Sequence, residues 1–330
     1  MEAMTTTETV RPGVLAPSRT PADTVAETLG DLAGQALREE ALLTPKPGLV
    51  DRRGGGSHHD MDLPVLLASA DALAEPIAAC ARVAQVLPLG RALRAEIGAL
   101  GRAGEQRMLD ATGGVNTHRG ALWALGLLAA GLAATGTLSG ASGFAARLAD
   151  LDDPAVPSRD ASNGGRVELR YGAPGAMGEA RRGFPHITRV ALPALLATRA
   201  AGHGEHTART DALLASMAAL EDTCLLHRAG PEGLRTVRGG ALAVLRAGGS
   251  GTPHGEALLG ELDVVCRVRG LSPGGSADVL AAALFLDSAL PLTKDKTVRV
   301  PKDKAVPLTK DKALPPTADR PLPLTADRSS

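Results

Sequence analysis

Five short polar clusters interrupt an otherwise apolar chain, and their residue types suit phosphate binding and proton transfer. The first cluster, Leu42 to Asp62 (LLTPKPGLVDRRGGGSHHDMD), holds Lys46, the only lysine before residue 291. Pro45 and Pro47 stiffen the backbone on both sides of Lys46, which suits a fixed point-charge contact to phosphate. A solvated loop lysine is the alternative, and this cluster alone does not separate the two interpretations.

The same cluster ends in side chains that bind divalent cations. His58, Asp60 and Asp62 lie within five residues of one another. Carboxylates together with ordered waters are the ligands that Mg²⁺ prefers. We therefore expect a Mg²⁺ site here, although Asp62 would be explained equally well as the N-cap of a helix that starts near Leu63.

Two glycine-hinged helix starts predict anion sites. Each places two glycines directly before a long apolar segment, so backbone N–H groups and the positive end of a helix dipole can face a phosphate. An arginine in the first of them can add a bidentate contact. An ordinary turn with an N-cap would leave the same pattern. The residues of these two starts are Gly113, Gly114, Asn116, Thr117, Arg119, Gly274, Gly275 and Ser276.

The remaining two clusters carry groups for acid–base chemistry. They are VELRYGAPGAMGEARRGFPHI, residues 167–187, and LEDTCLLHRAG, residues 220–230. By spacing alone, a charged loop and a capped helix would explain them as well as a catalytic site would. Their candidate residues are Glu168 and Glu179 in the first, and Asp222, His227 and Arg228 in the second.

Together the clusters suggest a polyphosphate ligand held by a helical scaffold. The chain contains neither GxxxxGK[ST] nor GxGxxG, so the common nucleotide-binding folds are not indicated. Hydrophobic residues make up 44% of the chain and aromatic residues only 2%, so Ala, Leu and Val must form the core. Long Ala- and Leu-rich runs favour helix over strand. We expect one compact all-α domain over residues 21–290.

The elements expected to position the clusters are all helices. A buried Ala/Leu-rich helix over 120–134 should be central, followed by a turn and a short helix. Pro64, Pro76 and Pro88 should divide residues 63–100 into two or three helices, and 150–183 should be a long loop. Further helices are expected over 190–199, 208–227, 234–246, 256–269 and 276–290.

The flanking segments and the bulk properties limit the class of protein. Residues 1–20 and the Pro-, Thr- and Lys-rich repeats of 291–330 are expected to be disordered. The charge-free window from Arg119 to Arg147 could span a bilayer by length, but its second half (ATGTLSGASG) is small and polar, which favours a buried helix. A formal net charge of +0 argues against a nucleic-acid-binding surface.

The three cysteines and the N-terminus bear on the cellular compartment. Cys80, Cys224 and Cys266 lie far apart and are expected to be buried, reduced thiols. The N-terminus has no basic start followed by an apolar run, as a secretory signal would have. We therefore expect a cytoplasmic protein.

The order and wording of the clusters resemble a known family. LTPKPGLVDRRGGGSHHDMD, TGGVNTHRGALWALGLL, RYGAPGAMGEARRGFPHI, DTCLLHRAG and LSPGGSADVLAAALFL occur as in the triphosphoribosyl-dephospho-CoA synthase family. Their wording is closer to the malonate decarboxylase-associated branch than to the citrate lyase branch. The resemblance covers about residues 22–290. Cys224 departs from it, since Asn is expected there.

The resemblance implies an all-helical transferase that joins ATP to 3'-dephospho-CoA. A ribose hydroxyl of dephospho-CoA would displace adenine from C1 of the ATP ribose in one inverting step, without a covalent enzyme intermediate. The product would then pass to a separate transferase that acts on an acyl carrier protein. A Mg²⁺-dependent hydrolase of a nucleotide N-glycosidic or ADP-ribose-like bond is the alternative, and a non-enzymatic helical binding protein is a third possibility.

Each candidate residue has an expected role in this reaction. Phosphates are assigned to Lys46, Arg119 and the two glycine turns, and Mg²⁺ to Asp60 and Asp62 with His58. Departure of adenine through an oxocarbenium-like transition state needs a base, a negative charge near C1 and a proton donor. The candidates for the base or the charge are Glu168, Glu179 and Asp222, and those for the proton donor are His118 and His227.

Overall fold

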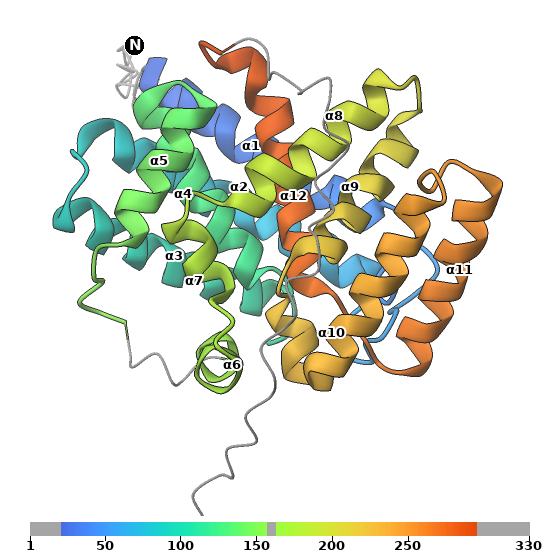
Figure 1. Cartoon of the computed structure of the whole chain (residues 1–330). Coiled ribbons are helices and arrows are strands. Elements are labelled where there is room, and N and C mark those ends of the chain that lie inside the picture. Colours follow the sequence, from blue (N-terminus) through green and yellow to red (C-terminus); the bar gives the residue numbers. More distant parts are fainter. Residues whose placement is uncertain (1–20, 157–162, 296–330) are drawn as a thin grey trace, which may run out of the picture.

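A computed structural model describes residues 21–156 and 163–295, and every regular element in these ranges is helical (Figure 1). The all-α prediction is confirmed. The helices are α1 (Pro21–Leu42), α2 (Leu63–Val86), α3 (Arg91–Ala111), α4 (Arg119–Thr135), α5 (Leu138–Ala149), α6 (Asn163–Tyr171), α7 (Gly175–Arg181), α8 (Leu192–Ala200), α9 (Glu205–Ala219), α10 (Thr223–Arg246), α11 (Pro253–Val268) and α12 (Gly274–Ala289). A short π-helix (Ile187–Ala191) precedes α8, and a 3₁₀ turn (Leu290–Leu292) follows α12.

Two apolar helices form the centre of the molecule. α12 runs through the middle of the bundle (Figure 1), and it packs against α1, α4 and α9. All residues from Val279 to Leu286 in α12 are buried. The predicted central helix is confirmed as α4; it ends at Gly136, whose positive φ of 69° suits glycine, and α5 follows. The starts of α4 and α12 are therefore held rigidly by core packing.

The segment after Leu63 forms two helices, α2 and α3, within the predicted two or three, but Pro76 does not divide it as the sequence pattern suggested. Pro76 lies inside α2, which continues unbroken to Val86. A proline inside a helix removes one backbone hydrogen bond. Close packing accounts for the continuity, because α1 approaches α2 so tightly that a Cβ at Gly30 would lie 2.5 Å from the Ala74 carbonyl oxygen. Tertiary contact thus outweighs the local cost of the proline.

Two other predicted elements differ from the structure. The helix expected over 208–227 is two helices, since α9 ends at Ala219 and Asp222 caps the start of α10. The long loop expected over 150–183 contains α6 and α7. Because α6 and α7 are short, the sequence pattern does not distinguish them from a charged loop.

The start of the expected C-terminal tail also differs. Lys294 N donates to Gly136 O at 2.9 Å, and Asp295 accepts from Leu138 N at 2.6 Å, so residues 291–295 contact the α4–α5 turn. The remainder of the predicted disordered tail, and residues 1–20, lie outside the described residues.

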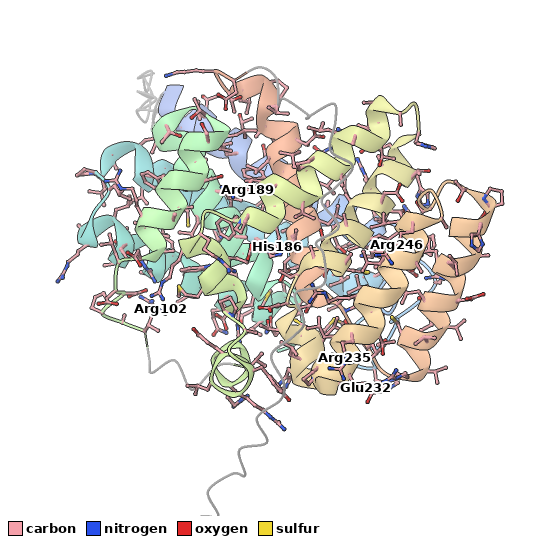
Figure 2. The ribbon with its side chains drawn as sticks, viewed as in Figure 1. Arg102, His186, Arg189, Glu232, Arg235 and Arg246 are labelled. Atoms are coloured by element: carbon pink, nitrogen blue, oxygen red, sulfur yellow. The ribbon has the colours of Figure 1, made fainter. Side chains whose placement is uncertain are left out.

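Two helices are long and apolar enough to cross a membrane by length and composition alone: Leu63–Val86 and Gly274–Leu292. Both pack in the interior of the bundle, and core helices of this kind pass the same test, so the finding is weak evidence for a span. Charged side chains cover outward faces of the bundle, such as Glu232, Arg235 and Arg246 on α10 (Figure 2).

Candidate functional site

The polar clusters meet where the N-terminal ends of α4, α10 and α12 approach the C-terminal end of α1. Asp222, which caps α10, accepts hydrogen bonds from the N–H and the hydroxyl of Ser276 in α12, at 2.8 and 3.0 Å. Gly120 in α4 lies so close to Asp278 in α12 that any side chain at residue 120 would collide with the carboxylate. Gly175, at the start of α7, packs beside the first turn of α10. We call this region the helix junction.

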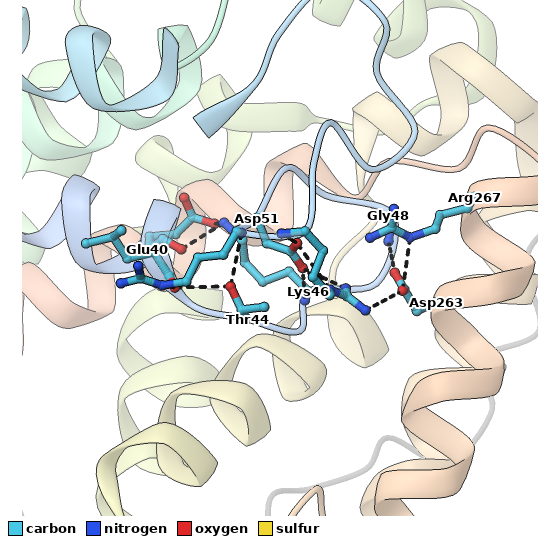
Figure 3. Close-up of polar contacts among 10 residues, drawn as sticks. Glu40, Thr44, Lys46, Gly48, Asp51, Asp263 and Arg267 are labelled. Atoms are coloured by element: carbon cyan, nitrogen blue, oxygen red, sulfur yellow. Dashed lines mark hydrogen bonds and ion pairs between the residues drawn. The ribbon is translucent and has the colours of Figure 1, made fainter. Parts of the chain in front are cut away.

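Lys46 pairs with a buried carboxylate instead of facing solvent (Figure 3). Its Nζ donates to Oε1 of Glu40 at 2.6 Å and to the Glu40 carbonyl oxygen at 2.8 Å. Only 1% of the lysine side chain and 5% of the glutamate side chain are exposed. The ammonium group has no exposed face for a phosphate in this structure, so the phosphate contact of Lys46 stays a prediction.

A second set of buried contacts fixes the loop after α1 against α11 (Figure 3). Asp51 is fully buried and accepts from Lys46 N at 3.0 Å and from the guanidinium group of Arg53. Burial alone would raise the pKa of Asp51, but these hydrogen bonds hold it below its ordinary value. Arg53 also pairs with Asp263 at 2.8 Å, and Asp263 accepts from Gly48 N at 3.1 Å. The sequence pattern did not identify this network.

His58 turns both ring nitrogens toward protein groups. Nε2 lies 2.7 Å from Ser272 Oγ, and Nδ1 lies 3.0 Å from Arg228 Nη2. Burial, followed by the positive charge of Arg228, lowers the pKa of His58. The predicted arginine of α10 and the loop after α1 are thereby joined to the segment that leads into α12.

The other two predicted metal ligands have different surroundings. Asp62 caps α2 by accepting from Val65 N at 3.1 Å, which confirms the capping alternative. Asp60 is 63% exposed and lies 3.5 Å from His58 Nδ1. Among the residues that the structure describes, no three His, Cys, Asp or Glu side chains are arranged to hold a metal ion. The Mg²⁺ site therefore stays a prediction.

His118 is buried at the start of α4 with one nitrogen that lacks a partner. Thr117 Oγ1 donates to Ser69 Oγ at 2.6 Å, and Ser69 Oγ lies 2.7 Å from His118 Nδ1. Since the serine hydroxyl proton then points to Nδ1, we infer that Nε2 carries the ring proton. Nε2 has no hydrogen-bond partner within the described ranges.

The ionisation of His118 follows from this burial. Burial lowers its pKa to about 4; the negative charge of Glu40 opposes this change, and the positive charge of Lys46 adds to it. The ring is therefore neutral at pH 7. This favours His118 as a hydrogen-bond donor through Nε2–H over the role of proton donor that we expected.

Asp222 holds α10 and α12 together. It is 1% exposed, and its Oδ1 accepts from the N–H groups of Cys224 and Leu225 while its Oδ2 accepts both contacts from Ser276. Burial raises the pKa of Asp222, although the hydrogen bonds oppose that rise. A Cβ at Gly275 would lie 3.2 Å from the carboxylate, so the glycine turn allows this close approach. These contacts fit the capped pair that we weighed as the alternative to a base.

The three cysteines are free thiols, as expected, but Cys224 is exposed. It lies beside α12, where a Cβ at Gly274 would come within 3.1 Å of its Sγ. The expectation that all three cysteines are buried is therefore wrong at this position.

Asp278 belongs to the second glycine-hinged helix start, and the sequence pattern gave it no catalytic role. The backbone N–H of Ala121, in the first turn of α4, donates to it. Burial, together with the negative charges of Asp222 and Glu40, raises the pKa of Asp278 well above its ordinary value. The sequence did contain a signal for Asp278. It lies four residues after Gly274, and residues four apart share one face of a helix.

The cluster over residues 167–187 forms its own buried network. Glu179 accepts from Arg182 Nη2 at 2.8 Å and lies 2.9 Å from His186 Nδ1 (His186 is labelled in Figure 2). Burial would raise the pKa of Glu179, but its contacts with His186 and Arg182 lower it. Trp123 of α4 donates to Ala176 O at 3.2 Å and ties this segment to the junction. Glu168 lies partly exposed on α6.

The remaining predicted residues line the approach to α4 or the surface of α10. Gly113 and Gly114 have φ values of 64° and 92°, which glycine adopts without strain. Arg119 forms an ion pair with Glu105 and is exposed, as are Asn116 and His227. Phosphate binding by these residues stays a prediction.

The hollows on the surface do not coincide with these residues. One, of about 390 Å³, is lined by uncharged residues of the α2–α3 turn (84–89) together with Ala134, Thr135 and Phe144. Another, of about 270 Å³, lies between α1 and α2 beside Arg38 and Asp71. Neither gathers the groups that phosphate or proton chemistry requires, so the helix junction remains the candidate site.

Comparison with known proteins bears on the chemistry of this junction. Residues 26–297 match the family described as ATP:dephospho-CoA triphosphoribosyl transferase. A protein of Azotobacter vinelandii is 53% identical over 82% of this chain and 94% of its own length. Proteins of Stutzerimonas stutzeri (52% identical, 82% of this chain, 94% of its own length) and Pseudomonas putida (53%, 80% and 95%) are similarly close. All three carry the description probable 2-(5''-triphosphoribosyl)-3'-dephosphocoenzyme-A synthase. No solved structure matches the chain.

Proposed function

Since the chain belongs to the ATP:dephospho-CoA triphosphoribosyl transferase family, we propose that the helix junction is where it carries out the family's reaction. The enzyme is a transferase that makes 2'-(5''-triphosphoribosyl)-3'-dephospho-CoA from ATP and dephospho-CoA. Transfer of the triphosphoribosyl group breaks the bond between C1 of the ribose and adenine, so adenine is the second product. The observation that supports this location is the meeting of the distant polar clusters at the starts of α4, α10 and α12.

The geometry suggests how the donor substrate is held. The starts of α4 and α12 present backbone N–H groups and positive dipole ends in one region, which favours a polyphosphate. Arg228 faces this region from α10 and is tied to His58 rather than to a carboxylate. The guanidinium group therefore keeps its positive charge available for a phosphate oxygen. We assign the triphosphate to this end of the junction.

The chemistry at C1 is a single displacement. The ribose hydroxyl of dephospho-CoA attacks as adenine leaves, and positive charge develops on the ring carbon and oxygen. Glu40, Asp222 and Asp278 place carboxyl groups around the junction, and a carboxylate held near C1 stabilises an oxocarbenium-like transition state. The Nε2–H of His118 is positioned as a hydrogen-bond donor on the same helix start.

In this proposal Mg²⁺ binds only together with ATP. Both nitrogens of His58 contact protein groups and Asp62 caps α2, so the three predicted ligands do not form a prepared site. Mg²⁺ commonly binds through substrate phosphates with few protein ligands. We therefore propose that Mg²⁺ enters as the ATP complex, and we assign it no fixed ligand set.

The biological setting follows from the branch that the sequence resembles. We propose that the product is the prosthetic-group precursor for the acyl carrier protein of a malonate decarboxylase, loaded by a separate transferase. We also propose a cytoplasmic enzyme without nucleic-acid or membrane partners, which a net charge of +0 supports.

One incubation tests the reaction. The full chain is mixed with ATP, Mg²⁺ and dephospho-CoA, and adenine and the coupled product are followed by chromatography and mass spectrometry. We expect adenine release that requires dephospho-CoA and equals the product formed. Adenine release without dephospho-CoA would instead identify a hydrolase, and the absence of adenine under all conditions would indicate a binding protein.

A further inference from the structure

The carboxylates near the junction differ in how many protein groups they bind. Asp222, Glu40 and Glu179 bind several, and Asp278 binds fewer. Both oxygens of Asp222 accept two hydrogen bonds each, and Glu40 is engaged in an ion pair with Lys46. Glu179 is engaged by Arg182 and His186 in a separate network. A carboxylate occupied in this way cannot also accept a proton from a substrate without losing structural contacts.

Asp278 has a different environment. The N–H of Ala121 donates to its carboxylate, and its Oδ2 packs directly against Gly120, in the place that a side chain at residue 120 would take. Its side chain is partly exposed, although burial is the largest influence on its ionisation. Asp278 therefore accepts one backbone donor from α4 and keeps part of its surface exposed.

A second, independent observation indicates that a ligand occupies this region. His118 lies at the N-cap of α4, two residues before Gly120, and is 5% exposed. Its Nε2 is buried and has no partner among the described residues. Buried donors in proteins are nearly always satisfied, so a buried donor without a partner indicates a missing ligand or water. The unpaired donor and the available carboxylate therefore lie on the two helix starts that face each other.

We propose that Asp278 is the catalytic base of the transfer reaction, the group that takes the proton from the attacking ribose hydroxyl of dephospho-CoA. This inference rests on the proposed function. As the hydroxyl oxygen bonds to C1, its proton moves to the Asp278 carboxylate, and the electron pair of the C1–N bond leaves with adenine. Adenine takes a proton from water, and Asp278 later returns its proton to water, so protons balance over the cycle.

The charges around Asp278 increase its strength as a proton acceptor. The titratable groups that influence it are Asp222 from α10 and Glu40 from α1, and their negative charges increase its affinity for a proton. Cys224 also interacts electrostatically with Asp278. The hydrogen bond from Ala121 and the positive ends of α4 and α12 favour the ionised carboxylate. A carboxyl group whose pKa is raised in this way binds a proton more strongly, as the removal of a hydroxyl proton requires.

The substitution Asp278→Asn tests the proposal, because the amide oxygen can still accept from Ala121 N while the basic carboxylate is lost. We expect kcat to fall by about 10²–10⁴-fold, the usual contribution of a general base. The dissociation constant for MgATP should stay within about threefold of the wild-type value, since uniform binding is separate from this step. Wild-type kcat should decrease as the pH falls through the pKa of one group, and the variant should lack that limb.

Asp287→Asn is the matched control. Asp287 lies on the same helix and pairs with Arg199 at 2.7 Å, away from the junction, so this variant should keep wild-type kcat and the acid limb. The proposal is overturned if Asp278→Asn retains more than about a tenth of wild-type kcat. It is also overturned if the variant keeps the acid limb, or if kcat rises as the pH falls, which would indicate an acid.

A folding defect in Asp278→Asn would not leave the question open. The wild-type enzyme should show a normal solvent deuterium isotope effect on kcat together with its acid limb, and the absence of both overturns the proposal by itself. Failure of the proposed function is seen separately, since the wild-type enzyme would then release no adenine in response to dephospho-CoA. An active wild-type enzyme with a fully active Asp278→Asn variant refutes only the assignment of the base.

Discussion

Substitution of Lys46 by Met should unfold the protein at a much lower temperature, because it strands a buried carboxylate. The Lys46–Glu40 pair is 1% and 5% exposed, and its atoms lie 2.6 Å apart. Removing one partner of a buried ion pair costs about 3–5 kcal/mol, since the other charge stays buried without compensation. In a domain of this size 1 kcal/mol lowers Tm by about 2–4 °C, so Lys46→Met should lower Tm by about 6–20 °C.

The assay is thermal and urea unfolding of three variants beside the wild type. Lys46→Met combined with Glu40→Gln should recover part of the lost stability, because the stranded charge is removed as well. Arg38→Met is the matched control: the Arg38–Asp71 pair is 42% and 56% exposed, and such surface pairs contribute about 1 kcal/mol or less.

A specific result would refute this reasoning. If Lys46→Met melts within about 2 °C of the wild type while its KM for ATP rises strongly, Lys46 is a phosphate ligand, and the ion pair with Glu40 is incidental. The two interpretations of the lysine, structural and phosphate-binding, thus make opposite predictions about stability and substrate affinity.

Two further predictions concern the helix starts. Asp222→Ala removes the acceptor for four donors at the α10–α12 contact, and we expect a loss of about 3 kcal/mol in urea unfolding, whereas Ser276→Ala should lose about 1 kcal/mol; equal losses would contradict the four-donor arrangement. His118 has a folded pKa of about 4, below its unfolded value of 6.5, so the unfolded chain takes up the proton first as the pH falls. Between pH 7 and pH 4 the wild type should therefore lose about 3 kcal/mol more stability than His118→Asn. Parallel stability curves for the two proteins would show that His118 is not held neutral by burial.

Helix bounds were predicted most accurately where one strong local signal in the sequence determines them. The run of small and aliphatic residues after Arg119 gave α4 nearly to the residue, because a long apolar segment without prolines has few alternatives. Asp62 before a proline-containing helix start was a capping signal of the same local kind. Pro76 misled the prediction, since the packing of α1 on α2 that keeps the helix intact is not visible in the local sequence.

The candidate site was predictable as a set of motifs but not as a set of contacts. Asp222 and Ser276 are 54 residues apart, and nothing in either motif indicates that Ser276 donates hydrogen bonds to the Asp222 carboxylate. Lys46 and Glu40 lie on either side of a helix end, and their pairing depends on how the chain turns after Leu42. Asp278 was passed over because one carboxylate within an apolar helix is as typical of a structural contact as of a catalytic group.

The contact between Gly48 N and Asp263 spans 215 residues, and this separation affects how the protein is made. At a synthesis rate of about 5–20 residues per second, roughly 10–40 s pass between the emergence of Gly48 and that of its partner. During that interval the loop after α1 has no α11 to close on. The loop after α1 therefore lacks its contact with α11 until residue 263 has been synthesised, and the junction can form only after α12 has followed.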